Sequence, residues 1–297
     1  MSVPDRRRAI GEAVRAPPAA EDRTLSPTRI TYWQLPPSVR YRIGAVIGLV
    51  TAADSATGGF NSSVAARLQT PDGRYFLKAL PVEHRWAWTQ EREEQVAPHV
   101  ETVGARLIAR IVEDAWDVLI FDALDGHHAD YSPDSKDLGH VARLIERIGE
   151  LPCPNTPLRL AEQRLAAYTS KDQLHHFAGA SLLHTDLNPA NVIVDGDDAR
   201  IVDWGWATRG AAWLDAAYWV SWLIAAGHSP KQAEWWAEQV PAWRTATIEG
   251  VTAFAEANAK MWAGIGAGST DPWTRGIMTA SEAWRQYRQG TTASGGS

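Results

Sequence analysis

Short apolar runs separated by turn residues fill the first third of the chain, a pattern typical of β-strands. The runs expected to form strands are 49–54, 63–68, 75–80, 107–113 and 118–122. A helix is expected from Pro36-Pro37 through Ile47, because proline is tolerated in the first turn, and a second over 86–97 that ends at Pro98. This part of the sequence therefore predicts a small lobe built on five strands.

The spacing of apolar residues changes to that of helices after Gly126. Val141, Leu144, Ile145 and Ile148 recur at the period of an amphipathic helix over 137–150. Further helices are expected over 158–168 and 211–226, from Ser229, and beyond Pro241 and Pro272. Between them lie three strand-like runs, at 182–184, 191–194 and 200–202.

These patterns predict an α+β chain of two lobes with a short segment at either end. The four parts are a mobile arm (1–30), a sheet lobe (31–124), a mainly helical lobe (125–290) and a flexible Gly/Ser tail (291–297).

Composition and charge narrow the range of functions. The chain has 29 Lys and Arg against 35 Asp and Glu, a net charge of −6, and so lacks the basic excess of a nucleic-acid binder. Its one cysteine, Cys153, excludes an internal disulfide framework. Apolar runs fall short of the roughly 18 residues of a membrane span, and residues 1–30 lack the apolar core of a secretory signal. We therefore expect a cytoplasmic protein without a nucleic-acid or membrane partner.

Tryptophan is unusually frequent, with fifteen residues of which eleven follow Asp203. Most should pack a core, and some should line an aromatic pocket.

The strongest local motif is His184-Thr185-Asp186-Leu187-Asn188-Pro189-Ala190-Asn191, which is followed by an apolar run and then by Asp203-Trp204-Gly205. This is the H-x-D-x-x-x-x-N loop with a later D-aromatic-G, as in phosphoryl-transfer enzymes of the protein-kinase type. Phosphoryl transfer needs a positioned hydroxyl and neutralised phosphate charge. Asp186 can orient and deprotonate that hydroxyl, while Asn191 and Asp203 supply the oxygen ligands that Mg²⁺ prefers.

Two upstream features fit this chemistry. Lys78 lies within an apolar strand, where an ammonium group needs an anionic partner. Glu93 shares the apolar face of the following helix and is the favoured partner, with Glu91 and Glu94 as rivals. The Gly58-Gly59 turn can place backbone N–H groups over phosphates.

Together these residues make the chain resemble the aminoglycoside phosphotransferase family of small-molecule kinases, roughly from Trp33 to Arg288. The resemblance implies a bilobal protein-kinase-like fold, with a small five-stranded antiparallel sheet lobe, and an enzyme that uses ATP or GTP with Mg²⁺. It implies that Lys78 and Glu93 grip the nucleotide phosphates, that Asp186 is the catalytic base, and that Asn191 and Asp203 bind the metal. The nucleotide loop would comprise Gly58, Gly59, Phe60, Asn61, Ser62 and Ser63. The adenine pocket would comprise Phe121, Asp122 and Leu124.

The acceptor implied by the resemblance is a hydroxyl-bearing small molecule, such as an antibiotic, nucleoside or amino sugar, phosphorylated for resistance or self-protection. Residues 204–297 hold seven acidic and seven basic side chains, which favours an acceptor less cationic than an aminoglycoside. Asn188 stands where protein kinases carry a lysine, and no activation loop is recognisable, which argues against a protein substrate. A nucleotide-binding pseudokinase with a regulatory role stays open as the alternative. The sequence gives no oligomeric state.

Overall fold

The computed structural model describes residues 29–56 and 62–294. Most of the predicted arm and the end of the predicted tail lie outside the described residues. So do four residues of the predicted nucleotide loop, Gly58, Gly59, Phe60 and Asn61.

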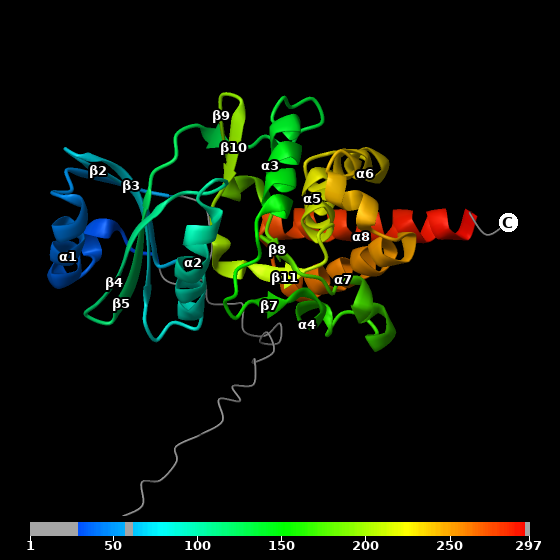
Figure 1. Ribbon diagram of the computed structural model, residues 1–297, viewed down its shortest axis with the longest axis horizontal. Coiled ribbons are helices and arrows are strands. Elements are labelled where there is room, and N and C mark those ends of the chain that lie inside the picture. Colours follow the sequence, from blue (N-terminus) through cyan, green and yellow to red (C-terminus); the bar gives the residue numbers. More distant parts are fainter. Residues whose placement is uncertain (1–28, 57–61, 295–297) are drawn as a thin grey trace, which may run out of the picture.

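The first part of the chain forms an antiparallel sheet in the order β1-β2-β3-β5-β4. The strands are β1 (Ala52–Ser55), β2 (Val64–Thr70), β3 (Gly73–Pro81), β4 (Leu107–Glu113) and β5 (Trp116–Asp122). Each prediction of a strand is confirmed, with bounds shifted by a few residues. Figure 1 shows helix α1 (Pro37–Ile47) on the outer side of this sheet and helix α2 (Ala87–Val100) on the side of the helical lobe.

Helix α2 continues two residues beyond Pro98, so the prediction that it ends there is wrong. The missing N–H of Pro98 removes one hydrogen bond in the last turn, where little helix remains to be disrupted. The end of α2 also packs into the core of the second lobe, through Val96, Val100 and the following Val103. The sheet has its own core, which α1 covers.

The second part of the chain is mainly helical, as predicted. Its helices are α3 (Leu138–Glu150), α4 (Ala161–Leu165), α5 (Leu214–Ala225), α6 (Pro230–Glu238), α7 (Ile248–Gly266) and α8 (Pro272–Ser294). Short 3-10 turns join them, among them η3 (Lys171–His176), η4 (Pro189–Asn191), η5 (Trp204–Trp206) and η6 (Pro241–Thr245). None of the helices in the described ranges is long and apolar enough to cross a bilayer.

Two small sheets lie among these helices. One has the order β10-β9-β6, and the other β7-β11-β8. Their strands are β6 (His127–His128), β7 (Arg159–Leu160), β8 (Ser181–Leu183), β9 (Val192–Asp195), β10 (Asp198–Ile201) and β11 (Thr208–Gly210). The helix predicted over 158–168 is therefore wrong at its start, because Arg159 pairs with Thr208 in a parallel ladder. Only 161–165 is α-helical.

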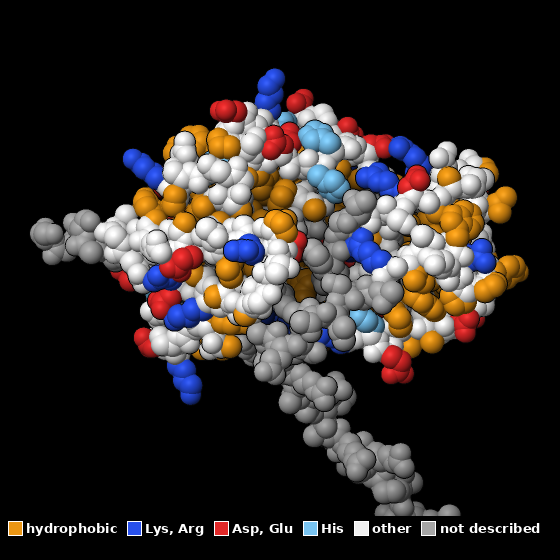
Figure 2. Space-filling view, turned by 180° about the vertical axis from the view of Figure 1, so that it is seen from behind, with side chains coloured by type: hydrophobic (Ala, Val, Ile, Leu, Met, Phe, Trp, Pro, Cys, Tyr) orange, Lys and Arg blue, Asp and Glu red, His pale blue; other side chains and the backbone are white. Residues whose placement is uncertain are grey.

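Most tryptophans after Asp203 serve the core, and Trp213, Trp219 and Trp284 are at most 3% exposed. On the face drawn in Figure 2, the acidic and basic side chains of the described residues are mixed, without a large area of one sign.

The two lobes are joined by a chain segment that runs against β9. Gly126 has φ +107°, and a Cβ there would stand 2.1 Å from the carbonyl oxygen of Val194. Only glycine fits such a backbone angle and such a close approach without strain.

We predict that Gly126→Ala lowers the free energy of unfolding by at least about 2 kcal/mol, because the new methyl group clashes with the backbone of β9. Gly149→Ala in α3 is the matched control, since nothing lies within 4 Å of its added Cβ. The control should change stability by less than about 1 kcal/mol, as expected for alanine in a helix. Urea denaturation measures both, and equal effects would contradict the close approach.

Candidate active site

The predicted site centres on the ammonium group of Lys78, which is buried in β3. Its Nζ donates to Glu93 Oε1 at 2.9 Å, to Glu93 Oε2 at 3.0 Å and to Asp203 Oδ1 at 2.9 Å. The two rival carboxylates point elsewhere: Glu94 pairs with Arg110 at 2.7 Å, and Glu91 accepts from Gln95. Lys78 therefore pairs with Glu93, the partner that the sequence favoured.

Burial alone would lower the pKa of Lys78, but the charges of Asp203 and Glu93 outweigh it and raise that pKa above its usual range. The side chain of Asp203 is 29% exposed, and the charge of Lys78 holds its pKa below the ordinary value. The lysine and Asp203 are thus both ionised at neutral pH. Burial raises the pKa of the Glu93 carboxyl, and the charge of Lys78 opposes that rise.

Backbone contacts fix where the two carboxylates stand. The N–H of Trp204 donates to Glu93 Oε1 at 3.2 Å, so the segment after Asp203 is tied to α2. Asp203 itself has φ +71°, a left-handed conformation that aspartate tolerates better than most residues. A Cβ on Gly205 would stand 2.9 Å from Thr89, so glycine permits η5 to lie directly against α2.

The loop that carries Asp186 is held in an unusual backbone conformation. Thr185 has φ +67°, which is rare for a β-branched residue and requires support from its surroundings. The buried carboxylate of Asp215 accepts the N–H of His184 at 2.9 Å and that of Thr185 at 2.8 Å. Arg164 donates to Thr185 Oγ1 at 2.6 Å. Asp215 therefore positions the loop.

His184 supports the same loop from its buried ring. Burial lowers its pKa to about 4, so the imidazole is neutral. Its Nε2 lies 3.0 Å from the carbonyl oxygen of Val202, and its Nδ1 accepts the N–H of Asp186 at 3.3 Å. These contacts assign the proton to Nε2, since a carbonyl oxygen can only accept.

Asp186 and Asn191 lie side by side in this loop. Asn191 Nδ2 donates to the backbone oxygen of Asp186 at 3.1 Å and to its Oδ2 at 3.0 Å. Burial, followed by the charge of Asp203, raises the pKa of Asp186 to about 6. The N–H of Val202 donates to the carbonyl oxygen of Asn191 at 2.9 Å, which links the loop to the residue before Asp203.

The donor set near these residues suits a magnesium ion that is shared with phosphates. Because Asn191 uses its amide nitrogen toward Asp186, its amide oxygen faces another direction, and Asp203 adds carboxylate oxygens. Within the described ranges, no three His, Cys, Asp or Glu side chains gather into a complete metal site. This fits Mg²⁺, which is usually bound through one or two carboxylates with phosphates and water.

The remaining predicted residues lie along β5 and β2. Phe121 is buried, with its ring centroid 5.9 Å from Lys78 Nζ. Asp122 pairs with Arg106 at 2.8 Å, and the carbonyl oxygen of Leu124 accepts from Arg67 at 3.1 Å. Ser63 joins the sheet through its N–H, which donates to Ala79, and Ser62 precedes it. The structure thus brings Lys78, Glu93, Phe121, Asp186, Asn191 and Asp203 into one region.

Arg164 is the residue near the site that sequence reasoning missed. It precedes Thr185 by 21 positions on a five-residue helix, and no motif spans the two. The sequence predicted only that Arg164 lies in a helix over 158–168.

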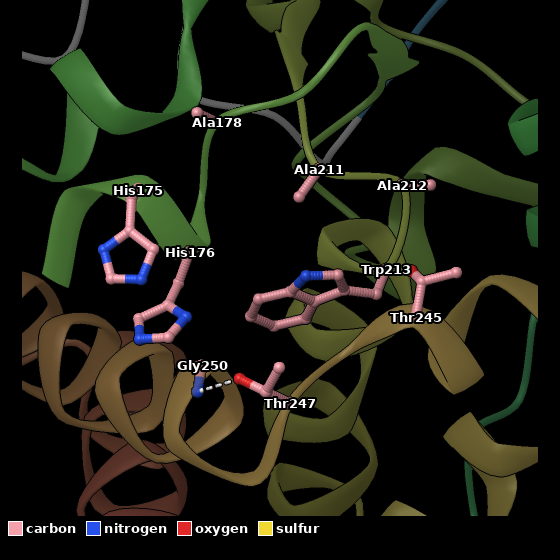
Figure 3. A pocket seen from close by; sticks show the side chains of 9 residues that line it. All are labelled: His175, His176, Ala178, Ala211, Ala212, Trp213, Thr245, Thr247 and Gly250. Carbon is pink, nitrogen blue, oxygen red and sulfur yellow. Dashed lines mark hydrogen bonds between the residues drawn. The ribbon is translucent and has the colours of Figure 1, made fainter.

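A separate cavity of about 320 Å³ lies beside the start of α5. Figure 3 shows the rings of His176 and Trp213 facing each other across it, with Thr245 and Thr247 at one side. Its lining includes none of the predicted catalytic residues. Among the described residues, Trp213 is the single tryptophan of this lining.

Residues 154–254 match the model of the phosphotransferase enzyme family. This segment contains the Asp186 loop, Asn191, Asp203 and Asp215. None of the curated protein sequences matches the chain.

Solved structures of small-molecule kinases share the fold. Aminoglycoside phosphotransferase APH(4)-Ia has a TM-score of 0.61 at 12% identity, covering 84% of this chain and 97% of that one. Choline kinase LicA from Streptococcus pneumoniae has a TM-score of 0.57 at 12% identity, covering 84% of this chain and 98% of that one. A thermostable APH(4)-Ia mutant in a ternary complex with AMP-PNP and hygromycin B has a TM-score of 0.59 at 12% identity, covering 86% and 98%. These likenesses confirm the predicted protein-kinase-like fold. The family match and the shared fold together confirm the resemblance that the motifs indicated, and they support a small-molecule phosphotransferase.

Proposed function

We propose that the protein is an ATP-dependent O-phosphotransferase that acts on a hydroxyl group of a small molecule. The observation that carries the proposal is the grouping of Asp186 and Asn191 with the Lys78–Glu93–Asp203 cluster across the two lobes. A site that only bound nucleotide would have no chemical need for a carboxylate placed like that of Asp186.

In this proposal Asp186 is the catalytic base. The acceptor oxygen forms a bond to the γ-phosphorus, the bond from that phosphorus to the oxygen bridging to the β-phosphate breaks, and the acceptor proton moves to Asp186. The pKa of about 6 suits this role, since the carboxylate is mostly ionised at neutral pH yet accepts a proton readily. Asn191 holds one oxygen of this carboxylate in place.

Lys78 would bind the phosphates and Asp203 the magnesium ion. Bound Mg²⁺ would neutralise charge on the phosphates. Lys78 makes one of its contacts with Asp203. Phosphate oxygens can replace that contact while Glu93 keeps the other two, so the lysine remains paired throughout. The glycine loop 58–63, Phe121, Asp122 and Leu124 are proposed to complete the nucleotide site.

The acceptor class is a hydroxyl-bearing small molecule, such as an antibiotic, a nucleoside or an amino sugar. Similar structures include a complex with AMP-PNP and hygromycin B, and a choline kinase, which supports a small acceptor and an adenine nucleotide. The balance of acidic and basic residues over 204–297 favours an acceptor less cationic than an aminoglycoside. We expect a cytoplasmic enzyme with a resistance or self-protection role. GTP is the other nucleotide to be tested.

The direct test is a screen for acceptor-dependent nucleotide consumption with ATP and GTP against antibiotics, nucleosides and amino sugars. Mass spectrometry should find one acceptor that gains a single phosphate. If nucleotide binds but no acceptor of these classes is phosphorylated, a regulatory pseudokinase becomes the better interpretation.

We predict different effects for the two key aspartates. Asp186→Asn should lower the single-turnover rate about 10²–10⁴-fold with little change in nucleotide affinity, because only the base is removed. Asp203→Asn should weaken nucleotide binding in the presence of Mg²⁺ as well as turnover, because it removes a charged metal ligand. Calorimetry with and without Mg²⁺ separates the two.

Two further variants sharpen this test. Asn191→Ala should resemble Asp203→Asn more mildly in nucleotide binding, because water can replace a neutral ligand. Asp195→Asn is the control, since Asp195 is exposed at the end of β9. This change should alter neither nucleotide affinity nor turnover. Small and equal effects from all four variants would show that the loop performs no chemistry.

A further inference from the structure

Three arginines gather around two tryptophans beside the predicted catalytic loop. We call Arg92, Arg159, Arg164, Trp88 and Trp206 the arginine–tryptophan cluster. The two indole rings meet edge to face with centroids 5.1 Å apart. The guanidinium of Arg159 lies 4.6 Å from the centroid of Trp88 and 5.3 Å from that of Trp206. Arg92 lies 5.9 Å from Trp88, and Arg164 lies 5.4 Å from Trp206.

Three stretches of chain that are distant in sequence build this cluster, one of which holds both β7 and α4. Trp88 and Arg92 belong to α2, Arg159 begins β7, Arg164 lies in α4, and Trp206 ends η5. Arg159 pairs with Thr208 in β11, and this pairing places the arginine beside Trp206 at the end of η5. The fold, and no local motif, therefore concentrates the positive charge here.

The charge of these arginines is not balanced by contact. No carboxylate among the described residues forms an ion pair with Arg92, Arg159 or Arg164. Other partly buried arginines differ, since Arg110 lies 2.7 Å from Asp117 and Arg288 lies 3.3 Å from Glu234.

The three guanidinium groups carry like charges and repel one another. Burial, together with the charges of Arg164 and Arg92, lowers the pKa of Arg159 to about 10. Burial also lowers the pKa of Arg92, although Glu91 partly offsets this. Burial raises the pKa of Asp186 and that of Asp215, and the charge of Arg164 opposes both rises although Arg164 forms no ion pair with either carboxylate. Stacking on indole rings compensates only part of the lost hydration.

The hydrogen bonds leave Arg159 as the group best able to take a ligand. Arg164 uses Nη1 on Thr185 Oγ1 and Thr208 Oγ1, and Arg92 uses Nη1 on the carbonyl oxygen of Ala207. Within the described part of the chain, the guanidinium of Arg159 makes ring contacts but no hydrogen bond. Its planar guanidinium matches phosphate and carboxylate groups, which it can bind through two parallel N–H bonds.

We propose that the arginine–tryptophan cluster binds an oxyanion, a phosphate or carboxylate group, with Arg159 as its main ligand and Arg92 and Arg164 beside it. This site is separate from the nucleotide site around Lys78. It touches α2, which carries Glu93, and Thr185, which precedes Asp186. A bound anion would therefore relieve the repulsion and hold α2 and the catalytic loop together. The anion is either a group on the acceptor or a free effector.

Inorganic phosphate at constant ionic strength is the probe, and calorimetry without nucleotide is the measurement. Saturable binding is expected for the wild type and for Lys78→Met, which removes the lysine of the nucleotide site. Arg159→Gln should weaken it at least about tenfold, and Arg159→Lys should weaken it less, because it keeps the charge without the planar fork. Arg209→Gln is the control, since Arg209 is exposed in the neighbouring strand β11 and should bind as the wild type does. Circular dichroism verifies that each variant is folded.

Unchanged affinity in Arg159→Gln, loss of binding in Lys78→Met, or no saturable binding at all would overturn the proposal. Because no nucleotide is present, these failures leave the proposed phosphotransferase untouched. A second experiment distinguishes the two sources of the anion by comparing uridine with uridine 5′-monophosphate as acceptors. A preference for the phosphorylated acceptor that Arg159→Gln abolishes supports an acceptor group. A saturable rise in the rate on uridine with added phosphate supports an effector.

Discussion

A lysine buried between two carboxylates is the constraint on which the rest of the site depends. An ammonium group cannot leave water without partners, and Lys78 finds all three of its contacts on Glu93 and Asp203. The three residues come from a central strand, from α2 and from the segment after β10, so satisfying one charge requires three elements to meet. The meeting of these elements puts carboxylate oxygens, which suit a magnesium ion, beside an ammonium group, which suits phosphates.

The surrounding backbone is organised to keep these elements together. Helix α2 contributes Val96 and Val100 to the core of the second lobe, so the helix that carries Glu93 packs into the same core as Leu187 of the catalytic loop. Gly205 admits η5 against α2, and the N–H of Trp204 donates to Glu93. Asp215 and Arg164 in turn hold Thr185 in a left-handed conformation that places Asp186 beside Asn191.

Much of this could be predicted from the sequence, because local patterns carry it. The five strands follow from short apolar runs and turn residues, and Glu93 follows from its place on the apolar face of α2. The Asp186, Asn191 and Asp203 motif follows from fixed spacing. What the sequence could not supply depends on tertiary pairing: Arg159 is drawn from an apparent helix into β7 by β11, and Arg164 reaches Thr185 across 21 positions. The clustering of arginines on Trp88 and Trp206 has the same origin, since three separate stretches of chain create it.

A double-mutant cycle on Lys78 and Glu93 tests the central claim most directly. Lys78→Met leaves the buried carboxylate of Glu93 and the carboxylate of Asp203 without their shared cation, so we expect it to lower the free energy of unfolding by about 3–5 kcal/mol. Glu93→Gln removes the charge and keeps an oxygen for the N–H of Trp204, but its amide nitrogen replaces one of the two oxygens that accept from Lys78. Urea denaturation of both single variants and the double variant gives the coupling energy between them. The account predicts that the double variant loses less than the sum of the single losses, with a coupling of about 1–3 kcal/mol. Additive losses, within about 0.3 kcal/mol, would show that the buried charges do not organise the site.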